Sequence, residues 1–193
     1  MTLENDSQYI VETTQGALRG REKHGALLFS GIPYAAPPIG EQRFRAAADA
    51  LPWSGLRDAT QFGPAAPQVP SGGMTDRVPV NWSEDCLTLN IMTPDAAGEL
   101  RPVLVWIHGG AYRSGQGAVP WYNGVSFATQ GNIVVVTINY RLGALGFTDL
   151  SSFSPDLETS GVNGLLDQIK ALEWVHNNIQ QFGGDPHQSD HRR

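Results

Sequence analysis

The chain has a single cysteine among its 193 residues, so no disulfide can form within it and a reducing compartment is the simplest context. Cys86 stands in the strand-like segment EDCLTLN, and no candidate base lies near it in the sequence. A thiol without an activating base is a poor nucleophile, whereas cysteine is common as a small buried side chain. We therefore expect Cys86 to be a core residue.

An excess of positive charge is also missing. The chain has 13 Lys and Arg against 19 Asp and Glu, a net charge of -6. It contains no basic stripe interleaved with aromatic residues, which is the pattern that follows a phosphate backbone. The sequence therefore predicts no nucleic-acid partner.

Long hydrophobic runs are absent. The longest, VLVWI and IVVV, have the length of strands and are too short to span a membrane. The opening MTLENDSQYIVETTQG carries acidic residues where a secretory signal would carry Lys or Arg, and no apolar stretch follows it. These features predict a cytoplasmic protein that does not interact with membranes.

What is present is typical of a folded domain. Hydrophobic residues make up 40% of the chain and charged residues 17%, a composition that favours a packed core over disorder. The length predicts one domain over residues 1–193. The segments YIVET, ALRGRE and ALLFSGIPY alternate apolar and polar residues, which predicts a small antiparallel meander. Residues 35–81 are rich in Pro, Gly, Ala and Ser, as expected of a long loop that serves a site or wraps a core.

The middle of the chain predicts a covered sheet. LTLNIMTP has the character of a strand, and RPVLVWIHGG and IVVVTINY are apolar on both faces, which is typical of parallel strands with helices on each side. The segment YNGVSFATQGN between the last two is expected to form a short helix. A strand, a crossover and a second strand predict a parallel pair.

A long helix is predicted over GVNGLLDQIKALEWVHNNIQQFGG. Five apolar residues at helical spacing should lie against the sheet: Leu165, Ile169, Leu172, Val175 and Ile179. Glycines 183 and 184 and then Pro186 end the helix. In an alternating α/β pattern the next element should be a strand, but the chain continues with the polar HQSDHRR. We therefore expect no strand there and an unpaired edge beside VLVWI.

Several motifs together resemble the type B carboxylesterases, the α/β-hydrolase relatives of cholinesterases and bacterial para-nitrobenzyl esterases. The similarity extends from about residue 9 to residue 186. It rests on five segments that occur in the order of the family: GIPYAAPPIGEQRF, SEDCLTLN, VLVWIHGGAYRSG, TINYRLGALGF and GLLDQIKALEWVHNNIQQFGGDP. The resemblance implies an α/β fold, namely the N-terminal part of an α/β-hydrolase: a small antiparallel meander, then a mostly parallel central sheet with helices, cut off before the nucleophile strand.

The resemblance also implies site residues. The N–H groups of Gly110 and Ala111 would form part of an oxyanion hole, and His108 and Gly109 would support their loop. Glycines suit this task because they let the backbone turn and bring N–H groups close to a substrate oxygen. The alternative for His-Gly-Gly alone is a tight turn without a ligand.

Other residues have structural or binding roles by resemblance. Arg43 with Glu84, and Arg141 with Asp167, match positions that form internal ion pairs, which buried charges also require. The aromatic residues that could line an acyl or alcohol pocket, or else belong to the core, are Trp82, Trp106, Tyr112 and Trp121; Tyr112 and Trp121 are the substrate-binding candidates.

A serine esterase also needs a nucleophile in a Gly-x-Ser-x-Gly turn, followed by an acid and a histidine. The sequence contains no such turn, since Ser54, Ser71, Ser114 and Ser160 lack glycine at one or both required offsets. The resemblance implies a carboxylic ester hydrolase for small-molecule esters, with no cofactor and no metal, whereas the chain alone is predicted to be inactive. His187 and His191 stand four residues apart, a spacing that we attribute to chance rather than to a metal site.

Residues 187–193 do not resemble the family. Ser-Asp-His-Arg-Arg can be encoded by bases that in a shifted frame read Val-Thr-Ile-Ala-Gly, the kind of strand that the family has here, so a frameshift after Gln188 is one hypothesis. Two other readings of the chain stay open. It could be a non-catalytic binding module of the same fold, or half of an esterase completed by a separate C-terminal chain.

Overall fold

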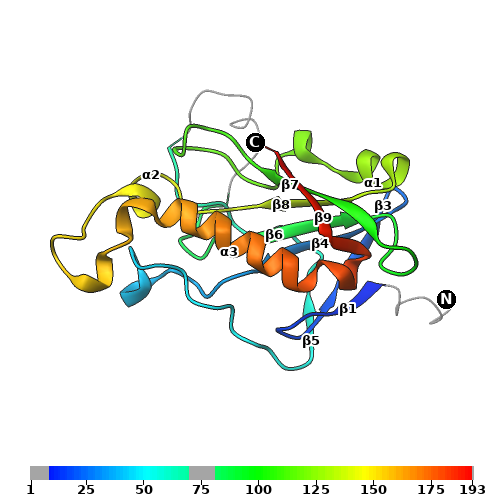
Figure 1. The fold of residues 1–193 in the computed structure, drawn as a ribbon, viewed down its shortest axis with the longest axis horizontal. Coiled ribbons are helices and arrows are strands. Elements are labelled where there is room, and N and C mark those ends of the chain that lie inside the picture. The colour runs from blue at the N-terminus through cyan, green and yellow to red at the C-terminus, as the bar shows by residue number, and fades with distance from the viewer. Residues whose placement is uncertain (1–8, 70–80, 193) are drawn as a thin grey trace.

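The computed structural model describes residues 9–69 and 81–192. The interpretations of residues 1–8, of the segment 70–80 with Ser71, and of Arg193 lie outside this part. The main sheet has six strands in the order β3-β4-β6-β8-β7-β9 (Figure 1). Their bounds are β3 Arg21–Lys23, β4 Ala26–Pro33, β6 Thr88–Thr93, β7 Arg101–Ile107, β8 Val134–Ile138 and β9 Gly184–Arg192.

Strand directions confirm the predicted parallel pair. β7 and β8 are parallel, with Val103 opposite Val134 and Ile107 opposite Ile138. β6 lies antiparallel to both β4 and β8, so the sheet is antiparallel on one side and parallel on the other. The α/β class predicted from the sequence is confirmed, and the sheet is open rather than closed.

The predicted N-terminal meander is divided between two sheets. β1 (Ile10–Glu12) and β2 (Ala17–Arg19) pair antiparallel in a small sheet, whereas β3 and β4 pair in the large one. The break falls at Gly20, where a Cβ would lie 2.7 Å from the Leu28 carbonyl oxygen, so only glycine lets the backbone pass so close to β4. The predicted loop 35–81 supplies β5 (Leu56–Asp58), which is parallel to β2.

The end of the chain departs from the prediction. Residues Gly184–Arg192 form β9, parallel to β7, so the expectation of an unpaired β7 edge is wrong. Gly183 turns the chain with a φ of 78°, and its carbonyl accepts a hydrogen bond from the Arg101 N–H at 2.9 Å. Strand pairing uses backbone groups that every non-proline residue carries, so a polar segment delivered beside an open edge can complete the ladder. The frameshift hypothesis stays a prediction.

Helices lie on both faces of the large sheet. α3 (Asn163–Asn178) packs on one face and α1 (Val125–Gly131) on the other (Figure 1). α2 (Gly143–Phe147) follows β8. Short 3₁₀ turns complete the chain: Gly40–Gln42, Pro120–Tyr122, Pro155–Leu157, Ser160–Val162 and Ile179–Phe182. Among the helices of the described residues, none has the length and apolar character needed to cross a bilayer.

The buried face of α3 is not the predicted stripe. Val175 and Ile179 are buried as expected, but Leu165 and Ile169 are 39% and 51% exposed, so the prediction is wrong at the start of the helix. The residues that are buried there are polar or small, with Asp167 fully covered. Asp167 is held by Arg141 from the segment after β8, so a buried ion pair, and not the apolar stripe, sets the rotation of this part of the helix.

Most of the core lies between the sheet and α3. Alternate residues of β7 and β8, such as Val105 and Val136, point to this side and pack with Trp174 and Val175 of the helix. Cys86 is fully buried in the same cluster, as predicted. Its burial, followed by the nearby Asp167 carboxylate, raises the pKa of the thiol to about 12.

Candidate active site

The glycine loop leaves β7 at its carboxyl end and turns sharply. Gly110 has a φ of 120°, and Ala111 and Tyr112 follow with φ of 53° and 59°. A Cβ on Gly110 would clash with the Ser114 carbonyl oxygen. The Gly110 carbonyl accepts hydrogen bonds from the N–H groups of Arg113 at 3.0 Å and Ser114 at 3.2 Å, which closes the turn. Glycine is therefore required at position 110 for both conformation and space.

The turn leaves two backbone donors available. Within residues 9–69 and 81–192, no group accepts a hydrogen bond from the N–H of Gly110 or Ala111. Both residues are exposed. Adjacent unpaired N–H groups at the end of a parallel strand are well placed to bind an oxygen that carries negative charge.

These two residues line an open hollow of about 870 Å³. Its other walls come from the loop before β6 and from the start of α2. The lining residues are Pro67, Gln68, Val69, Trp82, Gly110, Ala111, Arg113, Ser114, Leu142, Gly143, Ala144 and Leu145. The lining is largely apolar, with the loop donors at one side, which suits a small organic molecule with one polar group.

His108 is packed beneath the loop. Its ring is buried, stacks on Tyr140 with centroids 4.5 Å apart, and places Nδ1 2.9 Å from the Gly109 carbonyl oxygen. The Tyr140 hydroxyl donates a hydrogen bond of 2.7 Å to the His108 carbonyl oxygen. A Cβ on Gly115 would clash with the imidazole, so the loop closes directly over the ring. The buried imidazole of His108 therefore fills the space beneath the loop and supports its backbone from Gly109 to Gly115.

Gln68 fastens the far end of the same loop, and the sequence analysis did not identify it. Its side-chain N–H donates to the Gly115 carbonyl at 2.9 Å, and its Oε1 accepts from the Gly115 N–H at 2.8 Å. Gln68 lies in the Pro-rich segment, 47 positions before Gly115, and no local pattern links the two. Only the folded chain brings them together.

A buried ion pair supports the opposite wall of the hollow. The Arg141 guanidinium donates two hydrogen bonds to the Asp167 carboxylate, Nε to Oδ2 at 2.8 Å and Nη2 to Oδ1 at 2.7 Å, and the Arg141 backbone N–H donates a third to Oδ2 at 3.1 Å. Both side chains are almost fully buried. Leu142 and Gly143 follow directly and line the hollow, and the Gly143 N–H donates to the Tyr112 carbonyl at 2.7 Å. The pair therefore anchors α3 to the segment that faces the glycine loop.

The second pair, Arg43 with Glu84, is present but largely exposed. Arg43 Nε lies 2.5 Å from Glu84 Oε2, and Nη2 lies 2.9 Å from Oε1. The hydrogen bond and charge of Glu84 raise the pKa of Arg43 above its usual range. Neither residue lines the hollow.

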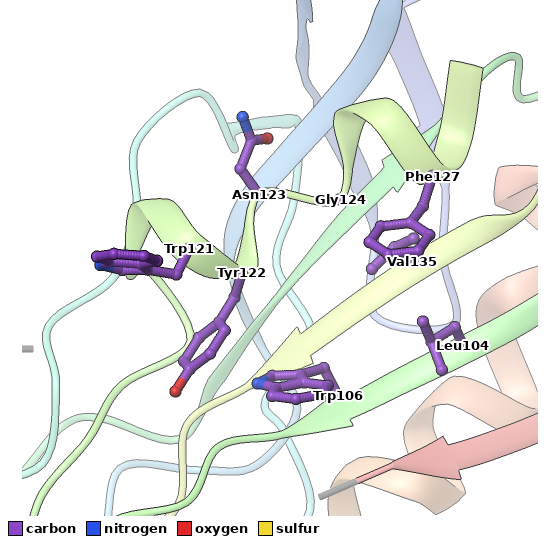
Figure 2. Close-up of a pocket in the computed structure, with 8 residues that line it drawn as sticks. All are labelled: Leu104, Trp106, Trp121, Tyr122, Asn123, Gly124, Phe127 and Val135. Carbon is purple, nitrogen blue, oxygen red and sulfur yellow. The ribbon is translucent and has the colours of Figure 1, made fainter. Parts of the chain in front are cut away.

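The four aromatic candidates lie in three places. Trp82 lines the hollow beside Gly110 and Ala111. Tyr112 packs against Tyr140 and Phe147. Trp106 and Trp121 line a separate apolar pocket of about 300 Å³ near α1, so the structure does not bring Trp121 to the hollow (Figure 2).

The α/β fold and the glycine loop define a hydrolase-like architecture, and comparison with known proteins gives the family. The family model described as the carboxylesterase family matches residues 7–188, so the chain belongs to this family. Its relatives place it among the type B carboxylesterases. It is 46% identical to the para-nitrobenzyl esterase of Bacillus subtilis over 181 residues, and 44% identical to the phenmedipham hydrolase of Pseudarthrobacter oxydans over 181 residues.

The similarity covers nearly all of this chain but a minor part of its relatives. The Bacillus alignment includes 92% of this chain and 36% of the esterase, and the Pseudarthrobacter alignment includes 92% and 35%. Among solved structures, the Geobacillus stearothermophilus carboxylesterase EST55 matches with a TM-score of 0.88 at 47% identity, over 95% of this chain and 37% of that one. The chain therefore spans about a third of the length of these relatives and corresponds to their N-terminal portion.

Proposed function

We propose that residues 9–186 are the N-terminal portion of a type B carboxylesterase domain, and that their part in the reaction is to supply the oxyanion-binding loop. The observation that carries this proposal is the pair of unpaired N–H groups at Gly110 and Ala111, at the carboxyl end of β7 and on the wall of the hollow. Membership of the family supports the reaction class, hydrolysis of a carboxylic ester.

The chemistry follows from the position of these donors. When a serine attacks an ester carbonyl, negative charge develops on the carbonyl oxygen of the tetrahedral intermediate. Donors that are fixed before the reaction stabilise this charge without further reorganisation. In this chain the turn at Gly110 and the ring of His108 hold the donors in place. No atom lies within 4 Å of the position that a Cβ of Gly109 would take, so the space beside this residue is open. This mechanism requires no cofactor and no metal.

The nucleophilic serine, its histidine and its acid must come from polypeptide outside these residues, because residues 9–186 contain no Gly-x-Ser-x-Gly turn. We therefore expect the chain alone to show no specific esterase activity. The role of Tyr112 and Trp121 as substrate contacts stays a prediction. Trp82 is a stronger candidate in position, since it lines the hollow.

A chimera tests the proposal. Residues 9–186 replace the matching segment of the Bacillus subtilis para-nitrobenzyl esterase, and the hydrolysis of a para-nitrobenzyl ester is followed. The chimera should hydrolyse the ester, and the chain alone should not exceed the uncatalysed rate. In the chimera, Gly110→Ala should lower kcat by about 100-fold or more with a small change in KM. Alanine keeps the N–H group, but its Cβ does not fit against the Ser114 carbonyl, so the loop must shift and move the donors away from the oxyanion, an effect comparable to the loss of one donor.

Ala111→Gly is the matched control. It keeps the N–H group and relieves a side chain from a left-handed φ of 53°, so kcat should stay within a few-fold. Circular dichroism of both variants separates a displaced loop from an unfolded protein. A folded Gly110→Ala chimera with unchanged kcat would show that this loop does not bind the oxyanion.

A further inference from the structure

The hollow beside the glycine loop has charge of one sign. Among the described residues that line it, Arg113 alone has a charged side chain, and the others are apolar or neutral. The chain as a whole has the opposite balance, since its 19 Asp and Glu outnumber its 13 Lys and Arg. A cleft lined by one sign of charge attracts molecules of the other sign. The hollow therefore favours a ligand that carries negative charge.

The backbone of Arg113 belongs to the same turn as the two loop donors. Its N–H donates to the Gly110 carbonyl at 3.0 Å, and the ring of the preceding Tyr112 packs against Phe147 with centroids 4.8 Å apart. Arg113 comes two positions after Ala111, and two residues of chain span at most about 7 Å. One small molecule can therefore contact both the loop donors and the guanidinium of Arg113.

The guanidinium of Arg113 is free to bind a ligand. The side chain is exposed, and within residues 9–69 and 81–192 it forms no ion pair and no hydrogen bond. The other arginine side chains that the structure describes have partners, namely a carboxylate, a backbone carbonyl, an indole ring or an amide. They are Arg19, Arg43, Arg45 and Arg141, then Arg21, Arg57 and Arg101. Arg113 thus differs from them in keeping its N–H donors unused.

A carboxylate is the anionic group that suits these donors in an ester substrate. A guanidinium is planar, stays charged at neutral pH and binds a carboxylate through two parallel hydrogen bonds. Such a pair is stronger beside the largely apolar wall of the hollow than in open water. An ester with a free carboxylate would be held at two points, its carbonyl oxygen by the loop donors and its carboxylate by Arg113.

We propose that Arg113 determines substrate specificity by selecting esters that carry a free carboxylate, such as monoesters of small dicarboxylic acids. This inference rests on the proposed function, because it places the ester carbonyl at the donors of Gly110 and Ala111. Binding of the carboxylate requires no hydrolysis, so it can be measured on a chain that lacks the nucleophile.

Binding of three esters to the full chain tests the proposal by isothermal titration calorimetry. Para-nitrobenzyl hexanoate is neutral, para-nitrobenzyl hydrogen adipate has a carboxylate on its acyl part, and 4-carboxybenzyl hexanoate has one on its alcohol part. Arg113→Gln should weaken binding of at least one charged ester by about 10-fold or more, because a charge-assisted pair is lost. Binding of the neutral ester should change by less than about two-fold. Arg113→Lys should keep part of the affinity, since it keeps the charge but not the paired donors.

Arg57→Gln is the matched control, because it removes the same charge from an exposed arginine of β5 that does not line the hollow. All three esters should bind it as they bind the wild type, and circular dichroism should show the same fold for every variant. Equal losses in Arg57→Gln and Arg113→Gln would show that only long-range attraction acts, which overturns the proposal. Unchanged binding by Arg113→Gln, or no binding of either charged ester by the wild type, would overturn it as well.

Hydrolysis by the chimera separates this inference from the proposed function. There Arg113→Gln should lower kcat/KM for the charged ester mainly through KM, because the carboxylate contact is the same in the substrate and in the transition state. An equal fall of kcat with charged and neutral esters would show that Arg113 acts on the oxyanion and would overturn its role in specificity. A chimera that hydrolyses none of the esters would contradict the proposed function, whereas a selective loss of binding in the Arg113→Gln chain would still support this inference.

Discussion

On the α3 face of the large sheet Val103 and Val105 of β7 and the inward side chains of β8 are buried, whereas on the α1 face Leu104 and Trp106 of β7 remain half-exposed. The α3 face combines one continuous apolar cluster with the buried Arg141–Asp167 pair, and this pair also anchors one wall of the hollow beside the glycine loop. The α1 face has a small cluster around Val125, Ala128 and Val135, with an apolar groove next to it. The difference shows that this chain completes the interior that supports the glycine loop but not the interior on the other side.

The largest effect should come from breaking the buried ion pair on the α3 face. Asp167→Ala leaves the Arg141 guanidinium buried without its counter-charge, and the expected loss is about 3–5 kcal/mol in the free energy of unfolding. Urea unfolding followed by circular dichroism measures it. Replacing both residues, Arg141→Met with Asp167→Leu, should recover much of this loss, since an apolar pair avoids the desolvation cost.

The exposed Arg43–Glu84 pair provides the reference for this measurement. Glu84→Gln should change stability little, because exposed ion pairs are screened by water and salt. A loss from Glu84→Gln equal to that from Asp167→Ala would contradict the distinction between buried and exposed pairs.

The two faces should also differ in their response to truncation. Ile138→Ala on the α3 face removes a fully buried side chain and should cost about 2–5 kcal/mol. Phe127→Ala on the α1 face removes a larger but 60% exposed side chain, and the change should stay within about 0.5 kcal/mol. The same unfolding experiment compares them. If Phe127→Ala costs as much as Ile138→Ala, the groove is already packed in this chain and the contrast between the faces fails.

The last difference, which is small near neutral pH, is a pH dependence in the α3 core. Burial raises the pKa of Cys86 to about 12, whereas an unfolded thiol ionises at about 8.5. The protonated thiol is favoured in the folded state, so its contribution to stability is complete below about pH 8.5 and declines as pH rises toward 12, by at most about 1.4 kcal/mol per pH unit. Cys86→Ala should therefore lose stability less steeply than the wild type above about pH 8.5.

Urea midpoints measured at a series of pH values give both slopes. Tyr34, whose pKa burial also raises, is present in both proteins and does not affect their difference. Identical slopes for the two proteins would show that Cys86 ionises as easily in the folded chain as in the unfolded one.

Several elements could be predicted because their signals are local. The apolar runs of β7 and β8 and the helix between them follow from residue type and spacing over fewer than ten residues. The rotation of α3 could not be predicted in this way. Its apolar spacing favoured Leu165 and Ile169, but the partner of Asp167 lies 26 positions away, and burying that charge with its partner outweighs exposing two aliphatic side chains.

In the candidate site, too, local features could be predicted from the sequence and contacts between distant segments could not. The positions of Gly110 and Ala111 follow from their sequence motif, because the turn that they make is local. Gln68, which fastens the loop through Gly115, and the distance of Trp121 from the hollow depend on segments that meet only after folding. Aromatic residues have no pattern that distinguishes a wall of the hollow from the α1 side of the sheet.

The sequence by itself determined the class of the fold, the family, and most of the strands and helices of the central sheet, because periodicity and family motifs lie in contiguous segments of the chain. Only the tertiary structure decided that the polar segment after Gly183 pairs with β7, that Arg141 and Asp167 rotate α3, and that an aromatic groove stays open beside α1. The physical reason is that these three features depend on contacts between segments that are distant in the chain. The free energy of an open strand edge, a buried charge or an apolar face depends on which other segment packs against it, and the local sequence does not specify that segment.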